Sequence, residues 1–282
     1  MEILAISDIY GDEEIVEELV DRIKSRSNER IVIVAGDIGL YDKREESNYL
    51  EKVRGILYML LGACKFVFYV PGDTDLRSLE IDDEQIINLD RQYYIAEMGN
   101  MKIGLFGLGG APKQSVRESF PYLWDEHVNV IHEDTLKTLK MNYEKLIANG
   151  TDLTILVTHS PPYKAADYST PITLKEFVVL EEIIGEQGAK TKSRNPRHLG
   201  SKAIKEFVDD FMPAIHIFGH VHKQGGKIAG GSANVCHLSA LPYKLTGRKF
   251  LSMEIEEEGA KFSFDSVVEE YITFEDFIEC YL

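Results

Sequence analysis

Five apolar segments of this chain each end at a residue that can bind a metal ion, and this repetition constrains the fold more than any other feature. Each segment is four to six residues long and rich in β-branched or aromatic side chains, which predicts a buried strand. The residues that follow the five segments are Asp8, Asp37, Asp73, His159 and the pair His220 and His222. We therefore expect five strands that deliver metal ligands at their carboxyl ends.

The last of these segments, residues 214–218, leads into Gly219-His220-Val221-His222. Side chains at positions i and i+2 of a strand project to the same face of the sheet. Both imidazoles can then meet one ion at the end of the strand, and Gly219 leaves room for a close approach of the backbone.

Composition narrows the class of protein. The chain has 282 residues, 44% of them hydrophobic and 28% charged, which is typical of a soluble globular protein. The formal charge of −16 disfavours a general nucleic-acid surface. We find no segment that could cross a membrane, and a cleaved signal peptide would remove Asp8, so we expect a cytoplasmic protein. A homo-oligomer through an exposed edge of the C-terminal hairpins is an option that the sequence leaves open.

Periodicity predicts an alternation of strands and helices in one domain, residues 1–282. Expected helices cover residues 13–23, 48–61, 133–148, 175–184 and 201–212. Expected later strands cover residues 85–88, 93–97, 101–106, 227–229, 235–238, 249–255 and 260–267. We interpret residues 107–110 as a turn and the C-terminal tail, residues 269–282, as a short helix.

The ligand types indicate which metals would bind. Mixed carboxylate and imidazole ligands suit Mn, Fe, Zn or Co better than Ca, which prefers oxygen ligands. Six ligands are too many for one catalytic zinc ion with an open position. They suit two divalent or mixed-valence transition metals, which in such pairs hold a phosphate and activate a water molecule.

On these motifs the chain resembles the calcineurin-like metallophosphoesterases. The matching segments are Asp8-Ile9-Tyr10, Gly36-Asp37, Gly72-Asp73-Thr74-Asp75, His159 and Gly219-His220-Val221-His222. The resemblance implies an α/β fold, a four-layer α/β/β/α sandwich of two mixed sheets flanked by helices. It also implies that Asp8 and His222 bind one metal, that Asp73, His159 and His220 bind the second, and that Asp37 bridges them.

Three positions depart from the family pattern. Tyr10 stands where the family usually has a metal-binding histidine, and its phenolate could ligate iron or its ring could simply pack beside the site. Asp73 replaces an amide ligand with a carboxylate. Thr74 replaces a histidine that binds phosphate and is often assigned to protonating the leaving group, so activity would be reduced, because a hydroxyl cannot act as a general acid near neutral pH. Tyr41 is another conceivable phenolate, although a turn residue is the simpler interpretation.

A substitute acid could come from a candidate substrate-site loop, residues 185–200. Arg194, Arg197 and His198 form a cationic group in an acidic chain, and Ser201 could open the following helix and present backbone N–H groups to phosphate. A solvated basic loop with Ser201 as a simple helix cap is an equally good interpretation.

The sequence thus predicts a metal-dependent phosphoesterase in which a metal-bound hydroxide attacks phosphorus directly. The expected partner is a small phosphorylated substrate, and a phosphodiester or nucleotide-like compound is favoured. The alternative is a catalytically degenerate family member that binds metal or a phosphorylated ligand in a sensing or scaffolding role.

Overall fold

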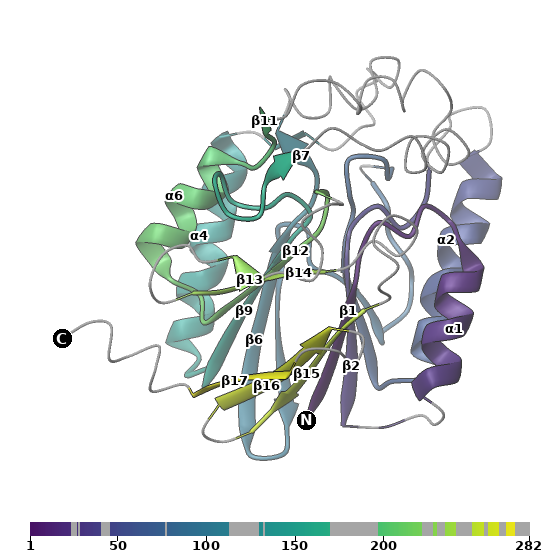
Figure 1. Ribbon diagram of the computed structural model, residues 1–282, viewed down its shortest axis with the longest axis horizontal. Helices are drawn as coiled ribbons and strands as arrows, with labels where there is room; N and C mark the ends of the chain where they lie inside the picture. The colour runs from purple at the N-terminus through teal and green to yellow at the C-terminus, as the bar shows by residue number, and fades with distance from the viewer. Residues whose placement is uncertain are drawn as a thin grey trace.

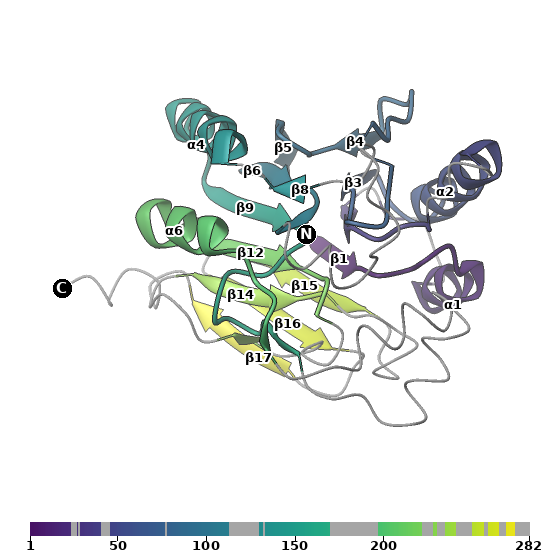
Figure 2. The ribbon, with the colours of Figure 1, turned by 90° about the horizontal axis from the view of Figure 1, so that it is seen from above.

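The computed structural model contains two mixed β-sheets packed face to face, with helices on both outer surfaces (Figures 1 and 2). The structure describes residues 1–23, 27, 29–40, 46–76, 78–112, 130–131, 133–169, 197–221, 228–229, 235–240, 250–256, 259–264 and 269–273. None of the helices in these ranges combines the length and the hydropathy that crossing a membrane requires.

The first sheet carries the N-terminal strands, and β1, β2, β3 and β4 run parallel at its centre and one edge. The C-terminal strands extend it in antiparallel pairing through β15, which pairs with β1. In spatial order its strands are β17 (Glu269–Thr273), β16 (Gly259–Phe264), β15 (Leu251–Ile255), β1 (Glu2–Ile6), β2 (Arg30–Ala35), β3 (Phe66–Val70) and β4 (Ile86–Asn88).

The second sheet has parallel strands β6, β9, β12 and β14 between antiparallel edge strands. In spatial order its strands are β13 (Ile228–Ala229), β14 (Cys236–Ser239), β12 (Ile215–Phe218), β9 (Leu153–Thr158), β6 (Met101–Leu108) and β5 (Tyr93–Met98). Two further pairs lie outside the large sheets: β7 (Ala111–Pro112) with β8 (Val130–Ile131), and β10 (Tyr168–Ser169) with β11 (Arg197–His198).

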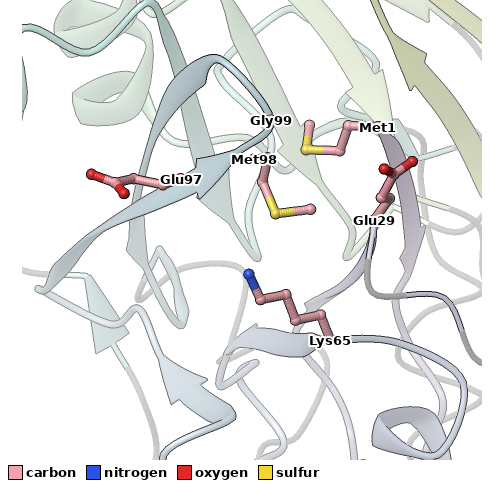
Figure 3. Close-up of a pocket in the computed structure, with 6 residues that line it drawn as sticks. All are labelled: Met1, Glu29, Lys65, Glu97, Met98 and Gly99. Carbon is pink, nitrogen blue, oxygen red and sulfur yellow. The ribbon is translucent and has the colours of Figure 1, made fainter.

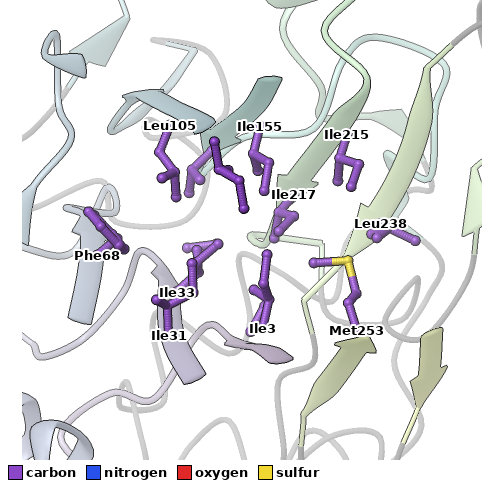
Figure 4. Packing of buried hydrophobic residues seen from close by; sticks show 14 of the residues in the cluster. Ile3, Ile31, Ile33, Phe68, Leu105, Ile155, Ile215, Ile217, Leu238 and Met253 are labelled. Carbon is purple, nitrogen blue, oxygen red and sulfur yellow. The ribbon is translucent and has the colours of Figure 1, made fainter. Parts of the chain in front are cut away.

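The central core lies between the two sheets and follows from the period of two along each strand. Ile3 of β1 and Ile33 of β2 point inward, where they meet Ile155 of β9 and Ile217 of β12 (Figure 4). The intervening residues point outward, and Val32 therefore packs beneath the helices. Because both faces are covered, the central parallel strands are predominantly apolar.

Two of the helices that the structure describes cover each outer face. Helices α1 (Glu13–Ile23) and α2 (Glu46–Leu61) pack on the first sheet, and α4 (Glu133–Ala148) and α6 (Lys202–Phe211) pack on the second. The result is the expected four-layer α/β/β/α sandwich. Asp12 accepts a hydrogen bond from the backbone N–H of Glu14 at the start of α1, and Ser201 caps α6 in the same way by accepting from Ile204.

Two details of the expected secondary structure were wrong, and one is not tested. Residues 269–273 form strand β17 rather than a helix, because Tyr271 and Ile272 extend the antiparallel ladder of β16. Gly107 continues strand β6, where its backbone pairs with Val157, so the turn begins later. The expected helix over residues 175–184 lies outside the described residues.

Candidate metal centre

The candidate ligands lie in the loops that directly follow β1, β2, β3, β9 and β12. Within each sheet these strands are parallel, so their carboxyl ends point the same way, and both sheets direct them to one end of the sandwich. The structure thereby brings together Asp8, Asp37, Asp73, His159 and His220, all at least 96% buried. His222 lies outside the described residues, as does Tyr41.

Several of these residues adopt a backbone conformation that L-residues rarely adopt. Asp8, Tyr10, Asp37 and His220 have φ angles of 55°, 54°, 52° and 70°. The left-handed region costs about 1–2 kcal/mol per non-glycine residue, and such conformations cluster at functional sites. The strand β12 ends at Phe218, so His220 lies in a turn rather than on a strand face, which corrects the expected i and i+2 geometry.

Glycines before the candidate ligands allow the loops to approach one another. A Cβ atom on Gly72 would lie 2.0 Å from Asp37 Oδ1 and 2.2 Å from Asp37 N. A Cβ atom on Gly219 would lie 2.8 Å from Asp8 Oδ2. Side chains at these two positions would push the ligand loops apart, which explains the repeated glycine before an acid or histidine.

One group of possible ligands consists of Asp73, His159 and His220, whose donor atoms all lie within 4.8 Å of one another. Asp73 Oδ1 lies 2.9 Å from His159 Nε2 and 3.1 Å from His220 Nδ1. The Nδ1 atom of His159 lies 2.8 Å from the carbonyl oxygen of Ala35, which can only accept a hydrogen bond. In the neutral imidazole the proton therefore sits on Nδ1, and Nε2 offers its lone pair toward the centre.

A second group consists of Asp8, Asp37 and His159. The Nε2 atom of His159 lies 3.5 Å from Asp37 Oδ1, so this imidazole is common to both groups. Asp8 Oδ2 accepts hydrogen bonds from the Ser7 hydroxyl and from the backbone N–H of His220 at 3.1 Å. These bonds orient one carboxylate oxygen by contacts from both sheets.

The electrostatics of the centre reflect the crowding of acids. Burial by itself would lower the pKa of His159, but the charges of Asp37 and Asp73 outweigh burial and raise it to about 10. Burial likewise opposes ionisation of Asp73, yet His220 and His159 hold the pKa of its carboxyl well below the usual range. A metal ion at His159 Nε2 would have to displace a proton at neutral pH.

The donor set fits transition-metal ions. Asp73 Oδ2 is buried and has no hydrogen-bond partner among the described residues, whereas a buried carboxylate oxygen ordinarily has one. A cation would satisfy this atom. Three carboxylates and two imidazoles, all buried at one end of the sandwich, match the ligand preference of Mn, Fe, Zn or Co.

Tyr10 and Thr74, two departures from the family pattern, both contact the carboxylates. The Tyr10 hydroxyl lies 3.4 Å from Asp8 Oδ1, and burial together with Asp37 and Asp8 raises its pKa well above the usual value. Thr74 directs its backbone N–H and its hydroxyl at Asp37 Oδ1, at 3.0 and 2.8 Å. Thr74 thus orients Asp37.

Asp75 belongs to a segment that matched the family pattern, but the sequence indicated neither its role nor its partner Tyr49. The buried Asp75 carboxylate accepts hydrogen bonds from the backbone N–H groups of Ile38, Gly39 and Gly72 and from the Tyr49 hydroxyl. Burial and the charge of Asp37 raise the pKa of Asp75 to about 6. This carboxylate ties the loops of Asp37 and Asp73 to helix α2, and the acid two residues after Asp73 was the signal in the sequence.

The expected substrate-site loop is described only from Arg197 onward. His198 lies on β11, and its Nδ1 atom is 2.7 Å from Oδ1 of the buried Asp167, a partner that the sequence did not indicate. Arg197 precedes it on the same strand, opposite Ser169. Arg194 lies outside the described residues.

A polar pocket of about 160 Å³ lies elsewhere (Figure 3). Its lining includes Met1, Lys65 and Gly99, which flank the amino-terminal ends of β1 and β3 and the β5–β6 hairpin. It is therefore at the opposite end of the strands from the candidate ligands.

One family model and one solved structure agree with this architecture. The family model described as calcineurin-like phosphoesterase matches residues 1–224. One crystal structure is 15% identical, with 97% of this chain and 98% of that chain covered and a TM-score of 0.56. TT1561 of Thermus thermophilus is 12% identical, with 97% and 98% covered and a TM-score of 0.49. The phosphopantetheinyl hydrolase of Mycobacterium tuberculosis is 14% identical, with 78% and 82% covered and a TM-score of 0.45.

At these identities the likeness to solved structures concerns the fold alone. No curated protein sequence matches the chain. The family match covers most of the chain, including the loops that carry Asp8, Asp37, Asp73, His159 and His220. The chain therefore belongs to the calcineurin-like phosphoesterase family.

Proposed function

We propose that the protein is a metal-dependent phosphoesterase with a dinuclear centre. The observation that carries this proposal is the convergence of five buried ligand-type side chains from two sheets, with the unpartnered Oδ2 atom of Asp73 among them. Asp8 and His222 would hold one ion, Asp73, His159 and His220 would hold the other, and Asp37 would be shared between them. When bound, such a pair supplies positive charge to the phosphate and activates water for direct attack on phosphorus.

The chain's own residues would prepare the site for that reaction. Thr74 and Asp75 fix the loops that carry Asp37 and Asp73 through hydrogen bonds to backbone and carboxylate. The carbonyl oxygen of Ala35 fixes the orientation of His159. His198 with Arg197 is the candidate contact for a phosphate group of the substrate.

A phosphodiester or nucleotide-like substrate fits the charge of the centre. Three carboxylates against two divalent ions leave a formal charge of +1, whereas the amide ligand usual in the family would leave +2. The weaker field lowers the attraction for a dianionic monoester more than for a monoanionic diester. Replacing the carboxylate with an amide, Asp73→Asn, should therefore shift the preference toward monoesters.

Metal analysis with hydrolysis assays tests the proposal. We expect two metal ions per chain and turnover of bis(4-nitrophenyl) phosphate with added Mn, Zn, Co or Fe, in excess of the turnover of 4-nitrophenyl phosphate. Asp37→Asn should abolish turnover, whereas Asp209→Asn, which removes a carboxylate from the exposed Lys205 ion pair, should retain it. A protein without bound metal would contradict the proposal. A visible band on iron loading that Tyr10→Phe removes would identify the phenolate as a ligand.

A catalytically degenerate family member that binds metal or a phosphorylated ligand is the second candidate. Thr74 favours it, because its hydroxyl is directed at Asp37 and cannot protonate a leaving group. Two bound metals without turnover of either aryl phosphate would decide for this sensing or scaffolding role.

A further inference from the structure

Three basic side chains gather around the ring of Tyr163, four residues after the candidate ligand His159. The Nζ atoms of Lys164 and Lys202 lie 5.6 and 5.3 Å from the centroid of this ring, within the range of a cation–π contact. The centroid of the His198 ring lies 5.1 Å from the ring centroid of Tyr163 and 5.2 Å from that of Tyr168. We call Lys164, Lys202 and His198 the cationic cluster.

A buried carboxylate holds this cluster in place. Asp167 is 1% exposed and accepts hydrogen bonds from His198 Nδ1 at 2.7 Å, from the backbone N–H of Lys164 at 2.9 Å and from that of Gly200 at 3.2 Å. Since a carboxylate only accepts, His198 carries a proton on Nδ1, and its other nitrogen, Nε2, belongs to a side chain that is 35% exposed. Asp167 thus fixes both the tautomer of His198 and the position of Lys164.

The cationic cluster is attached to the loop of a candidate ligand. His159 is followed by Ser160 and Pro161, and the carbonyl oxygen of Pro161 accepts a hydrogen bond from the backbone N–H of Ser201 at 2.8 Å. The backbone N–H of Tyr163 donates to the carbonyl oxygen of Ser201 at 3.0 Å. In Figure 1, β11 and β7 lie at the same end of the sandwich, and β7 follows the carboxyl end of β6, the end at which the candidate ligands lie.

Lys164 and Lys202 differ from Lys140 and Lys205 in having no carboxylate partner among the described residues. Neither Lys164 nor Lys202 forms an ion pair with any residue in the described ranges. By contrast, Lys140 pairs with Glu144 and Lys205 pairs with Asp209 along exposed helix surfaces. In a chain with 47 acidic and 31 basic residues, two lysines without an ion-pair partner in the described ranges give this ring a local positive charge, which the buried carboxylate of Asp167 beside His198 offsets only in part. Such a charge beside a phosphoester site suits an anion.

We propose that the cationic cluster is a subsite for a second anionic group of the substrate, outside the ester that is hydrolysed. The preferred substrate class is a phosphodiester whose organic part carries a further phosphate. This assignment rests on the proposed phosphoesterase function and names its specificity. Lys164 and Lys202 supply the charge, His198 Nε2 supplies a directed contact, and Asp167 is the positioning residue.

Two matched substrates test the subsite in the metal-loaded protein. Thymidine 5′-(4-nitrophenyl phosphate) has one phosphodiester, and its 3′-phosphorylated derivative carries the same diester with a second phosphate. We expect the derivative to have the lower KM. The KM of the parent diester divided by the KM of the derivative should then fall about tenfold in Lys164→Ala/Lys202→Ala. The control Lys140→Ala/Lys205→Ala removes the same charge from ion-paired lysines and should retain the wild-type ratio. Added salt should also reduce the ratio, because exposed charges are screened.

Equal KM values for the two substrates in the wild-type protein would overturn the subsite, as would the same ratio in both double variants. If neither substrate is hydrolysed, the proposed phosphoesterase function is refuted, and the subsite needs a test of its own. Binding of inorganic pyrophosphate to the metal-stripped chain, measured by calorimetry, then tests whether the subsite exists. Binding that Lys164→Ala/Lys202→Ala weakens and the control retains supports it, and binding that is absent or equally strong in both variants refutes it.

Discussion

The substitution Gly72→Ala tests most directly how the ligand loops are packed. The added Cβ would lie 2.0 Å from Asp37 Oδ1 and 2.2 Å from Asp37 N. Since real Cβ contacts essentially never fall below 3.0 Å, one of the two loops must move by about 1 Å. Gly72 has an ordinary backbone conformation, so the effect is steric and not a matter of glycine's torsional freedom.

The expected magnitudes follow from this displacement. Forcing extra volume into a packed site costs about 1–3 kcal/mol, a fraction of the roughly 5–15 kcal/mol by which a domain is stable. The protein should therefore fold with a lower urea midpoint. Metal ligands tolerate errors of about 0.2 Å, and disturbing the residues that orient ligands commonly costs 10–100-fold in affinity. A shift of about 1 Å in Asp37 itself should weaken Mn²⁺ binding by at least about 100-fold.

Calorimetric titration with Mn²⁺ and urea unfolding of the metal-free protein measure the two effects. Gly55→Ala is a matched control, because Gly55 lies on the exposed side of α2 and an added Cβ would have no neighbour within 4 Å. This control should retain metal affinity and gain up to about 1 kcal/mol of stability from helix propensity. Wild-type affinity and midpoint in Gly72→Ala would refute the packing of the Asp37 and Asp73 loops described above.

Three further outcomes are expected. Thr74→Val removes the hydroxyl that donates to Asp37 and should weaken Mn²⁺ binding about tenfold, measured by calorimetry. Thr74→Ser retains the hydroxyl and should retain the affinity. Equal Mn²⁺ affinities of the two variants would contradict a role of this hydroxyl in orienting Asp37. Because the pKa of His159 is raised to about 10, above its unfolded value, the stability it contributes is complete below about pH 6.5 and lost as the pH rises toward 10. Metal binding at pH 8 should accordingly release nearly one proton from His159, measured as different heats in two buffers of unlike ionisation enthalpy; no release would exclude it as a ligand. Tyr49→Phe removes a hydrogen bond to the buried Asp75 carboxylate and should lower the free energy of unfolding by about 1.5–3 kcal/mol, measured by urea unfolding, so an unchanged free energy would show that this bond is dispensable.

Sequence patterns predicted most of the fold because its elements have strong local signals. The apolar face of residues 13–23 repeats at helical spacing, and α1 has these bounds. The runs that end at Asp8 and Asp37 are apolar throughout, as strands covered on both faces must be. Residues 269–273 were assigned wrongly because their strand depends on pairing with β16, which is a non-local contact.

The ligands of the candidate site were predictable from the sequence, but the residues that position them were not. Asp8, Asp37 and Asp73 follow strands that lie side by side, so their convergence was implied by the strand pattern. The partner of His198 was not predictable, because Asp167 lies 31 residues away and only the pairing of β10 with β11 joins them. The role of Thr74 was not predictable either. The residue type shows that the acid usual in the family is absent, but it does not show that the hydroxyl contacts Asp37.

Thr74, which departs from the family pattern, is closely packed and hydrogen-bonded to its neighbours. Thr74 is 1% exposed, and its hydroxyl lies 2.8 Å from Asp37 Oδ1 and 2.9 Å from the carbonyl oxygen of Gly39. An imidazole at this position has no space unless the Asp37 loop moves, because the threonine already fills it. Restoring the family residue, Thr74→His, should therefore destabilise the protein by about 1–3 kcal/mol and fail to raise hydrolysis of bis(4-nitrophenyl) phosphate. A tenfold gain in turnover with an unchanged urea midpoint would show instead that the loop can accept an acid, and that only the proton donor is missing from this centre.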